Sequence, residues 1–384
     1  MTERTMRAVT IREYGGPDVL NVERVARPEP LPTEVLVRVH AAGVNPVDWK
    51  TREGRGMARL QTLPLILGWD VSGVVEEAGY GVTTLKPGDE VYGMPWFPRA
   101  AGAYAEYVTA PSRQWARKPA SLDHVHAAAV PLAALTAWQI IADTAGVRAG
   151  QRVLITAAAG GVGHFAVQFA RLRGAHVIAT AREPRHRWLK ELGAAETIDY
   201  TATRFEDAVK DVDVVIDLVG DVQDRTSTRA LGVLRPGGLL VAVPGGVSPD
   251  LAEAAKARGV RATSFLVEPD GPALSTIAGL IDAGDVTVAV EETFPLDQAR
   301  EAHVRGETGR TRGKLVLTAE IMDVILAATA EVRRMFGEMA GLVQPTPAPD
   351  ELIAQLEAYA QSEAGQPVQA PAKPAASPAQ NAAP

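Results

Sequence analysis

A strand, a glycine-rich turn and a helix follow one another in the middle of this 384-residue chain, and they constrain its fold more than any other feature. Residues 153–156 form a short apolar run typical of a buried strand, residues 158–163 form the turn, and residues 162–173 are expected to be helical. Further elements are expected downstream: strands at 176–180, 212–218 and 238–243, and a helix at 187–192. Strands that alternate with helices indicate a doubly wound α/β domain with a parallel sheet.

The segments before and after this α/β region have a different pattern. The first 120 residues contain short β-branched runs, such as 35–39 and 71–75, that are separated by glycine and proline turns, which is typical of a β-rich domain. The elements expected after residue 266 should return to that first domain: a helix at 274–283 and strands at 286–290 and 314–317.

The C-terminal end of the chain differs in composition from the rest. Residues 361–384 hold 8 alanines, 5 prolines and no aromatic residue, so this segment buries too little apolar surface to fold alone. We therefore predict four parts: a β-rich domain of residues 1–126 completed by about 266–320, an α/β domain of 127–265, a helical extension of 321–360 and a disordered tail of 361–384.

Composition excludes several classes of protein. The chain has no cysteine, which excludes disulfides, Fe–S clusters, a cysteine-ligated zinc and a cysteine nucleophile. Its net charge of −7 gives no electrostatic reason to expect nucleic acid or an anionic membrane as a partner. The first ten residues lack the apolar run of a signal peptide, and the longest apolar stretch, 127–142, is too short and too polar to span a membrane. We expect a cytoplasmic protein that acts on a small molecule.

The glycine turn is suited to bind the pyrophosphate of a dinucleotide. Gly160 lets the backbone approach the phosphates, Gly163 allows close packing of helix on strand, and the helix N-terminus offers unpaired N–H groups. Ala158 stands where the usual G-x-G-x-x-G motif has its first glycine. We predict that the turn binds cofactor through Ala158, Gly160, Gly161, Val162 and Gly163. The alternative is a tight structural turn without a ligand.

The end of the second strand predicts the type of cofactor. An acid about 20 residues after the start of the motif would bind the ribose 2′-hydroxyl of NAD. Ala181 occupies that position, and Arg182, Arg185 and Arg187 follow it. Guanidinium groups suit a 2′-phosphate, so we predict NADPH, with Arg182 and Arg185 as ligands. The alternative is a solvated basic turn.

Several segments together match a known family. They are residues 42–48 (AGVNPVD), 68–75 (GWDVSGVV), 86–93 (KPGDEVYG), 102–107 (GAYAEY), the glycine turn, 234–238 (LRPGG) and 312–316 (RGKLV). The chain from residue 6 to about 318 resembles the medium-chain dehydrogenase/reductase superfamily, in its zinc-free quinone oxidoreductase (zeta-crystallin-like) branch. The resemblance implies a GroES-like β-barrel catalytic domain and a Rossmann domain, with the active site in the cleft between them.

The resemblance also bears on metal binding. Zinc-dependent members have a Cys, a His and a Glu at the positions of Asn45, Trp69 and Asp70. Asn and Trp are not common zinc ligands, and a catalytic zinc needs three protein ligands. His124 and His126 are close in sequence, but they precede an apolar helix and no carboxylate or Cys is expected as their partner. We predict no metal site.

Without a Lewis acid, a substrate carbonyl must be polarised by hydrogen-bond donors, which suits conjugate reduction. The resemblance implies an NADPH-dependent oxidoreductase that transfers hydride to quinones or α,β-unsaturated carbonyls. In relatives, the residues matching Asn45 and Thr136 lie beside the nicotinamide ribose and the carboxamide. Lys50 is shared with plant-type enone reductases, and its ammonium either binds the ribose or stabilises the enolate; a solvated lysine is the alternative. We predict that Asn45, Lys50 and Thr136 are the catalytic residues.

Other positions have roles that the resemblance suggests less directly. Tyr200 aligns with a residue that contacts the 2′-phosphate in relatives, and Lys314 lies in the matching RGKLV segment, so both are predicted to bind cofactor. Asp48 is expected to be a structural ion-pair partner rather than a catalytic acid. Trp96 and Phe97 are expected to line the substrate cleft, or else to fill a core.

Two other functions are compatible with these motifs. An enoyl reductase acting on a thioester of coenzyme A or a carrier protein would need a basic patch at the cleft mouth, and Arg52, Arg55 and Arg59 are candidates for it. A binding or structural role is known for some zeta-crystallin-like proteins, including RNA binding, but the acidic charge argues against RNA here.

Residues 321–342 carry apolar side chains at heptad spacing, namely Ile321, Ile325, Ala328, Val332, Met335, Met339 and Leu342. A second apolar face follows at residues 352–359. A helix of about 22 residues is marginal alone in water, so its apolar face needs a partner surface. The extension is expected either to pack on its own catalytic domain or to dock another protein or a second copy through residues 321–360. We expect a homodimer.

Overall fold

The computed structural model describes residues 4–222, 224–243 and 247–319, and short stretches between residues 331 and 356. The chain divides into two compact units, Met1–Ala319 and Glu320–Pro384. In the second unit, Arg334 pairs with Glu331 at 2.7 Å and donates to the carbonyl of Thr346 at 2.9 Å. Most of the predicted apolar seam and all of the predicted tail lie outside the described residues, so these predictions stay untested.

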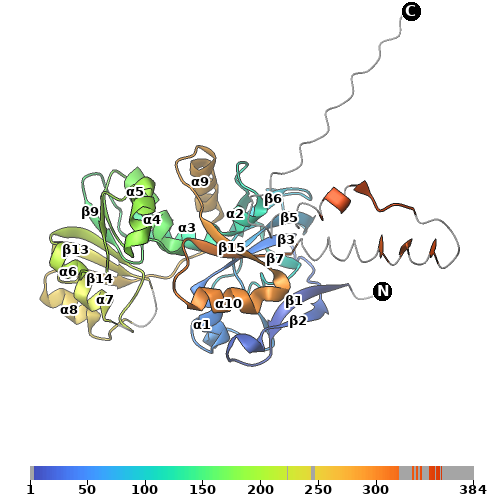
Figure 1. Ribbon diagram of the computed structural model, residues 1–384, viewed down its shortest axis with the longest axis horizontal. Helices are drawn as coiled ribbons and strands as arrows, with labels where there is room; N and C mark the ends of the chain where they lie inside the picture. Colours follow the sequence, from blue (N-terminus) through green and yellow to red (C-terminus); the bar gives the residue numbers. More distant parts are fainter. Residues whose placement is uncertain are drawn as a thin grey trace, which may run out of the picture. The chain divides into compact units, whose positions relative to one another are not determined.

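A parallel sheet occupies the middle of the sequence, as predicted (Figure 1). In the described residues its strands are β9 (Arg152–Ile155), β10 (His176–Thr180), β11 (Glu196–Ile198), β12 (Val212–Asp217), β13 (Leu234–Ala242) and β14 (Arg261–Ser264). They lie in the order β11-β10-β9-β12-β13-β14, and every neighbouring pair is parallel. Numbered along the chain this is 3-2-1-4-5-6, the order of a doubly wound Rossmann sheet.

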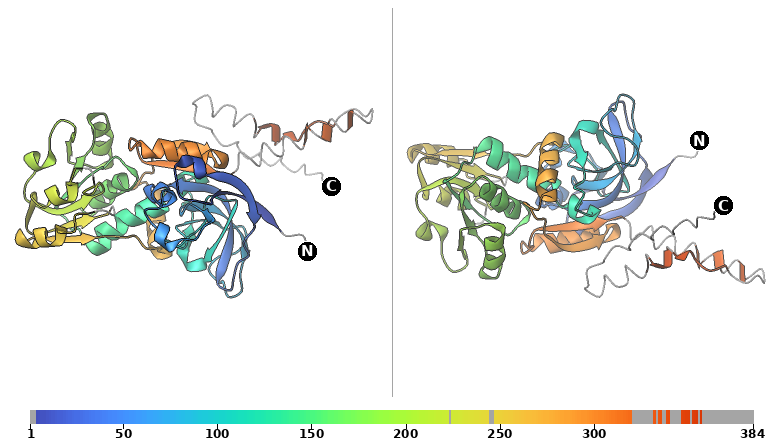
Figure 2. Two further views of the ribbon diagram at one scale, coloured as in Figure 1. Left: turned by 90° about the horizontal axis from the view of Figure 1, so that it is seen from below. Right: turned by 90° about the horizontal axis from the view of Figure 1, so that it is seen from above.

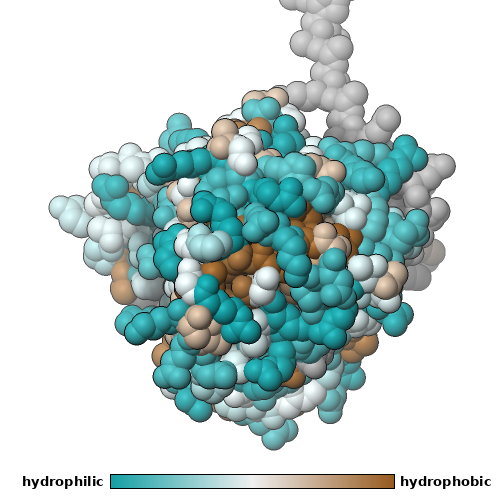
Figure 3. Space-filling model, turned by 90° about the vertical axis from the view of Figure 1, so that its left-hand side faces the viewer, coloured by the Kyte–Doolittle hydropathy of each residue, from teal (hydrophilic) through white to brown (hydrophobic). Residues whose placement is uncertain are grey.

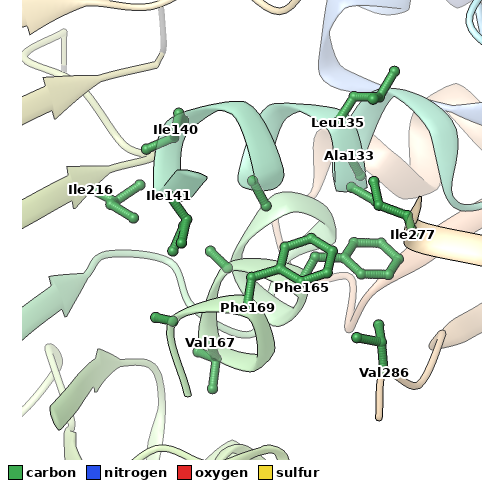
Figure 4. Packing of buried hydrophobic residues seen from close by; sticks show 14 of the residues in the cluster. Ala133, Leu135, Ile140, Ile141, Phe165, Val167, Phe169, Ile216, Ile277 and Val286 are labelled. Carbon is green, nitrogen blue, oxygen red and sulfur yellow. The ribbon is translucent and has the colours of Figure 1, made fainter. Parts of the chain in front are cut away.

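Alternating residues of β9 show how the sheet is covered on both faces. Val153 and Ile155 join one buried apolar cluster, while Leu154, between them, joins another. The first cluster is covered by α3 (Pro131–Trp138), α4 (Gly161–Leu172) and α9 (Gly271–Asp282), and Figure 4 shows Phe165 and Phe169 of α4 packed within it. Successive side chains of a strand point to opposite faces of the sheet. A strand with apolar residues at successive positions must therefore be covered on both faces of the sheet.

The remaining helices of the α/β part are short: α5 (His186–Leu192), α6 (Phe205–Ala208), α7 (Thr226–Ala230) and α8 (Leu251–Ala257). Helices α7 and α8 pack against the face of the sheet that carries Leu154. In a view onto the end of the molecule where these elements lie, hydrophilic residues cover most of the surface and apolar residues gather in the middle (Figure 3).

A β-rich part is built from the two ends of the first unit, Met1–Ala319 (Figure 2). Its strands are β1 (Thr5–Ile11), β2 (Asn21–Ala26), β3 (Glu34–Val44), β4 (Leu65–Ile66), β5 (Val71–Ala78), β6 (Glu90–Gly93), β7 (Tyr107–Pro111), β8 (Trp115–Arg117), β15 (Val290–Pro295) and β16 (Lys314–Thr318). Among them β16 pairs antiparallel with β3, so the chain returns to its first part as predicted. This part also contains α1 (Pro46–Arg52), α2 (His124–Ala128) and α10 (Ala299–Glu307).

The strand predicted at residues 286–290 is wrong, because the strand begins only at Val290. Val286 is buried in the cluster beside the parallel sheet. The side-chain amide of Gln168 accepts from the N–H of Thr287 at 2.8 Å and donates to the carbonyl of Thr287 at 3.0 Å. A side chain therefore satisfies this backbone where a neighbouring strand was expected.

Candidate active site

A pocket of about 1030 Å³ lies at the carboxyl ends of β9, β10 and β12. Strand order reverses between β9 and β12, and ligands of doubly wound sheets bind at such a switch point. Its walls carry five arginines, which are Arg182, Arg185, Arg204, Arg229 and Arg310. Of these, Arg310 comes from the segment between α10 and β16, so both parts of the chain contribute to the pocket.

The glycine turn closes one side of the pocket. Gly160 lines the pocket and precedes α4 as its N-cap. Gly163 lies behind it, where an added Cβ would meet the carbonyl oxygen of Ala157 at 2.5 Å and Cα of Ala158 at 2.6 Å, so only glycine fits. Ala158 is fully buried and bonds through its N–H to the carbonyl of Thr180. The residues of the turn therefore fit a dinucleotide, with Gly160 at the pocket surface.

The predicted basic residues lie on the pocket wall after β10. Arg182, Arg185 and Tyr200 all line the pocket. Nε of Arg182 donates to the hydroxyl of Tyr200 at 3.1 Å, and Arg185 lies 3.8 Å from Glu291. Sequence reasoning missed Arg204, Arg229 and Arg310, because they follow no motif and come from separate segments.

A second polar cluster lies at the ends of β3 and β16. Nζ of Lys314 donates to the carbonyl of Val44 at 3.1 Å, to Oδ2 of Asp70 at 3.2 Å and to Oδ1 of Asn45. Asn45, Asp70 and Lys314 are buried. The three protons of the ammonium are therefore matched by three internal acceptors, whereas we predicted Lys314 as a cofactor ligand.

The two other predicted catalytic residues lie in helices α1 and α3. Lys50 is half-buried in α1, and burial lowers the pKa of its ammonium, with Arg55 adding to the effect. Within the described residues, its ammonium has no hydrogen bond or ion pair. Thr136 is buried in α3, and its hydroxyl donates to the carbonyl of Leu132 at 2.7 Å. Among the predicted catalytic residues, Lys50 is therefore the one with a cation that has no hydrogen-bond or ion-pair partner in the described part of the chain.

Asp48 follows Asn45 closely and is fully buried. Its Oδ2 accepts from the N–H of Asn45 at 2.6 Å and from Tyr104, whose ring lies beside His303. Burial raises the pKa of Asp48 to about 7, although both hydrogen bonds favour the carboxylate. In the described part of the chain Asp48 therefore makes hydrogen bonds and not the ion pair that was predicted.

His303 continues this buried network to Arg52. Burial lowers the pKa of His303 to about 3, with Arg52 adding to the effect. Arg52 bonds to Nδ1 of His303 at 3.1 Å and pairs with Glu307 at 2.7 Å. Arg52 is completely buried, so the proposed basic patch of Arg52, Arg55 and Arg59 at a cleft mouth is wrong for this residue.

Three further sequence interpretations change. His124 lies 3.2 Å from Glu90 and His126 lies 2.8 Å from Asp123, so each has a carboxylate neighbour.

Phe97 is buried with its ring edge-on to Trp69. The Trp96 indole donates to the carbonyl of Thr109 at 2.7 Å and packs against the core of the β-rich part. Packing and backbone bonds therefore explain these aromatic residues.

Among the described residues, no group of three or more His, Cys, Asp or Glu side chains is placed to hold a metal ion. No helix there is long and apolar enough to cross a membrane.

A basic pocket at the switch point of a parallel sheet, beside a β-rich part that supplies buried polar groups, defines a two-domain dinucleotide-dependent enzyme. Sequence profiles agree with this class. One described as "Alcohol dehydrogenase GroES-like domain" matches residues 31–120, and one described as "Zinc-binding dehydrogenase" matches residues 192–317.

The chain belongs to the quinone oxidoreductase (zeta-crystallin-like) family of medium-chain dehydrogenases/reductases, and it is an NAD(P)-dependent oxidoreductase. It is 35% identical to NAD(P)H oxidoreductase RTN4IP1, mitochondrial, of Danio rerio, over 82% of this chain and 91% of the relative. It is 36% identical to the chloroplastic NADPH-dependent alkenal/one oxidoreductase of Arabidopsis thaliana, over 82% and 80%. The structure of the quinone oxidoreductase from Coxiella burnetii matches with a TM-score of 0.79 and 38% identity, over 82% of this chain and all of that one.

Proposed function

We propose that this protein is an NADPH-dependent reductase of quinones or α,β-unsaturated carbonyls that works without zinc. One observation carries the proposal: Arg182 and Tyr200 are hydrogen-bonded to each other on the wall of the pocket at the end of β10, where an NAD-specific enzyme would have an acid. The name of the Arabidopsis thaliana relative, an NADPH-dependent alkenal/one oxidoreductase, supports the same substrate class.

The pocket residues fit the parts of NADPH. Gly160 and the N-terminus of α4 would hold the pyrophosphate, since the helix offers N–H groups there. Arg182, Arg185 and Tyr200 would hold the 2′-phosphate, because guanidinium groups form charge-assisted bonds with phosphate oxygens. Asp224 is the acidic residue of this pocket and lies 2.8 Å from Arg229, which neutralises it.

The nicotinamide end would lie toward the cluster of Asn45, Asp70 and Lys314. The side chain of Lys314 passes beside the glycine turn, because an added Cβ on Gly161 would lie 3.0 Å from its Cδ. In this proposal Asn45 holds the nicotinamide ribose and Thr136 holds the carboxamide.

When bound, NADPH supplies the hydride that reduces an electron-poor double bond or a quinone ring. The residue proposed to stabilise the negative charge that develops on the substrate oxygen is Lys50. Its ammonium has no partner within the described residues and is half-buried, so its charge is poorly screened by water. Protonation of the neighbouring carbon then completes the reduction of an enone.

The domain boundaries predicted from the sequence and a homodimeric state remain part of this proposal. The enoyl-thioester alternative loses one of its candidate residues, because Arg52 is buried.

A panel of quinones, enals, enones and an enoyl-coenzyme A, each assayed with NADPH and with NADH, tests the proposed function. We expect turnover of a quinone or an enone with a higher kcat/KM for NADPH. Turnover of the enoyl thioester alone, or equal kcat/KM with the two cofactors, would contradict the proposal.

A further inference from the structure

All three N–H donors of the Lys314 ammonium have acceptors inside the protein. A lysine has three N–H donors. Here they meet the carbonyl of Val44, Oδ1 of Asn45 and Oδ2 of Asp70. The side chain of Lys314 is 3% exposed and that of Asp70 is not exposed at all. A role for this ammonium as a ligand of a cofactor phosphate would therefore require it to give up one of these acceptors.

The two charged residues determine how the carboxamide of Asn45 is oriented. An ammonium can only donate and a carboxylate can only accept, whereas a carboxamide does both. Oδ1 of Asn45 therefore faces Lys314, and Nδ2 faces Oδ2 of Asp70 at 2.8 Å. The other oxygen of Asp70 accepts from the N–H of Leu132 at 2.6 Å, which fixes the carboxylate in turn.

This orientation leaves one donor of Asn45 uncommitted. Nδ2 carries two N–H groups, and Asp70 is its one acceptor among the described residues. A reversed carboxamide would place Nδ2 against the ammonium of Lys314 and Oδ1 against the carboxylate of Asp70. Both contacts would be repulsive, so a single orientation is stable.

Lys314 also connects this cluster to the glycine turn. The N–H of its neighbour Gly313 donates to the carbonyl of Ala159 at 3.0 Å. The stem of Lys314 lies against Gly161, at 3.0 Å from the position of an added Cβ. One residue thus reaches from the phosphate end of the proposed cofactor site to Asn45.

We propose that Lys314 is a positioning residue, which acts with Asp70 to hold the Asn45 carboxamide in the one orientation that presents its free N–H to the nicotinamide ribose. The inference deepens the proposed function and rests on its placement of Asn45 beside the cofactor. It assigns to Lys314 an indirect role in place of a phosphate contact.

The test uses the full-length chain and a neutral exchange of the pair, Asp70→Asn with Lys314→Met. This double variant removes both charges together, because either single change would leave an uncompensated buried charge. Its Asn side chain at position 70 can still accept from Leu132 through its oxygen. Its amide nitrogen would then face Asn45, which must turn its own oxygen toward it. We expect this double variant to keep the fold and to reverse the carboxamide of Asn45.

The readouts are the NADPH dissociation constant, measured by nicotinamide fluorescence, and kcat with an enone. We expect the double variant to melt near the wild-type temperature, while the dissociation constant rises about tenfold, as for one lost hydrogen bond, and kcat falls. In an Asn45→Ala background, the same exchange should change neither quantity, because Lys314 then has no carboxamide to orient. A further loss in that background, as for an independent phosphate contact, would overturn the inference. So would wild-type binding and kcat in the double variant itself.

If the double variant does not fold, Lys314→Arg gives the answer. Guanidinium is also a donor-only cation, so NADPH binding should stay within about threefold of the wild type. A loss as large as that of Asn45→Ala would overturn the inference. Failure of the proposed function is seen separately, since the wild type would then bind no NADPH or reduce none of the substrates.

Discussion

The hydroxyl of Tyr104 donates a hydrogen bond of 2.9 Å to Oδ2 of Asp48, and neither side chain is exposed to solvent. The second oxygen of Asp48 has no partner among the described residues. Burial is the largest influence on this carboxyl group and raises its pKa from 3.8 to about 7. The folded protein therefore holds the proton of Asp48 at pH values where the unfolded chain has released it.

This raised pKa predicts a specific dependence of stability on pH. Because the folded state binds the extra proton, the free energy of unfolding falls as the pH rises from about 4 to about 7. Asp48→Asn removes the titration and keeps an acceptor for Tyr104. Between about pH 5 and pH 8 the wild type should lose about 2–3 kcal/mol relative to the variant. Urea denaturation of both proteins at the two pH values measures the free energy of unfolding. If the wild type and Asp48→Asn differ by the same amount at both pH values, the prediction is wrong.

Arg182 should control the preference for NADPH. Arg182→Gln removes one charge-assisted contact to the 2′-phosphate, so KM for NADPH should rise about 10- to 100-fold, while KM for NADH stays unchanged. Arg187→Gln is the matched control, because Arg187 is 93% exposed in its side chain and pairs with Glu191 at 3.0 Å away from the pocket. Equal effects on the two cofactors would exclude a phosphate contact for Arg182.

Lys50→Ala should lower kcat about 100-fold and weaken NADPH binding much less, because a cation beside the forming enolate acts mainly in the transition state. Lys190→Ala, at an exposed position of α5, serves as the control. Steady-state kinetics and NADPH titration distinguish three results. A rise in KM for NADPH alone would make Lys50 a ribose ligand, and no change would make it a surface lysine. Either result would refute its proposed role.

Chelators should leave activity unchanged. Two positions that hold zinc ligands in zinc-dependent relatives carry Asn45 and Trp69, and the ammonium of Lys314 lies between Asn45 and Asp70. A divalent cation at that point would repel the ammonium. Elemental analysis and assays before and after EDTA treatment check the expectation. One tightly bound zinc per chain, removed together with activity, would contradict it.

The sequence predicted the parallel sheet and four of its six strands, but it missed several of the described helices, α10 among them. Strand β10 was predicted with its observed bounds, because its apolar run is flanked by clear breaks. Helix α10 was missed, since it buries only Ala299, Ala302, His303 and Gly306, which form no apolar stripe in the sequence.

The candidate site was predicted in part for a similar reason. Motifs identified Gly160 and Arg182, which lie on the pocket wall. The contacts of Lys314 with Asn45 and Asp70 join residues 269 and 244 positions apart, and no local pattern marks such a pairing. Local signals thus predict elements and motifs, whereas tertiary packing decides which polar groups meet.

The most direct test of the central claim is to follow the transferred hydrogen. An unsaturated aldehyde such as trans-2-hexenal is reduced with NADPH that carries deuterium at C4 of the nicotinamide, and the product is analysed by NMR and mass spectrometry. Conjugate reduction without a metal predicts the saturated aldehyde with deuterium on the β-carbon. Deuterium on the carbonyl carbon of an allylic alcohol would show carbonyl reduction and would contradict the account.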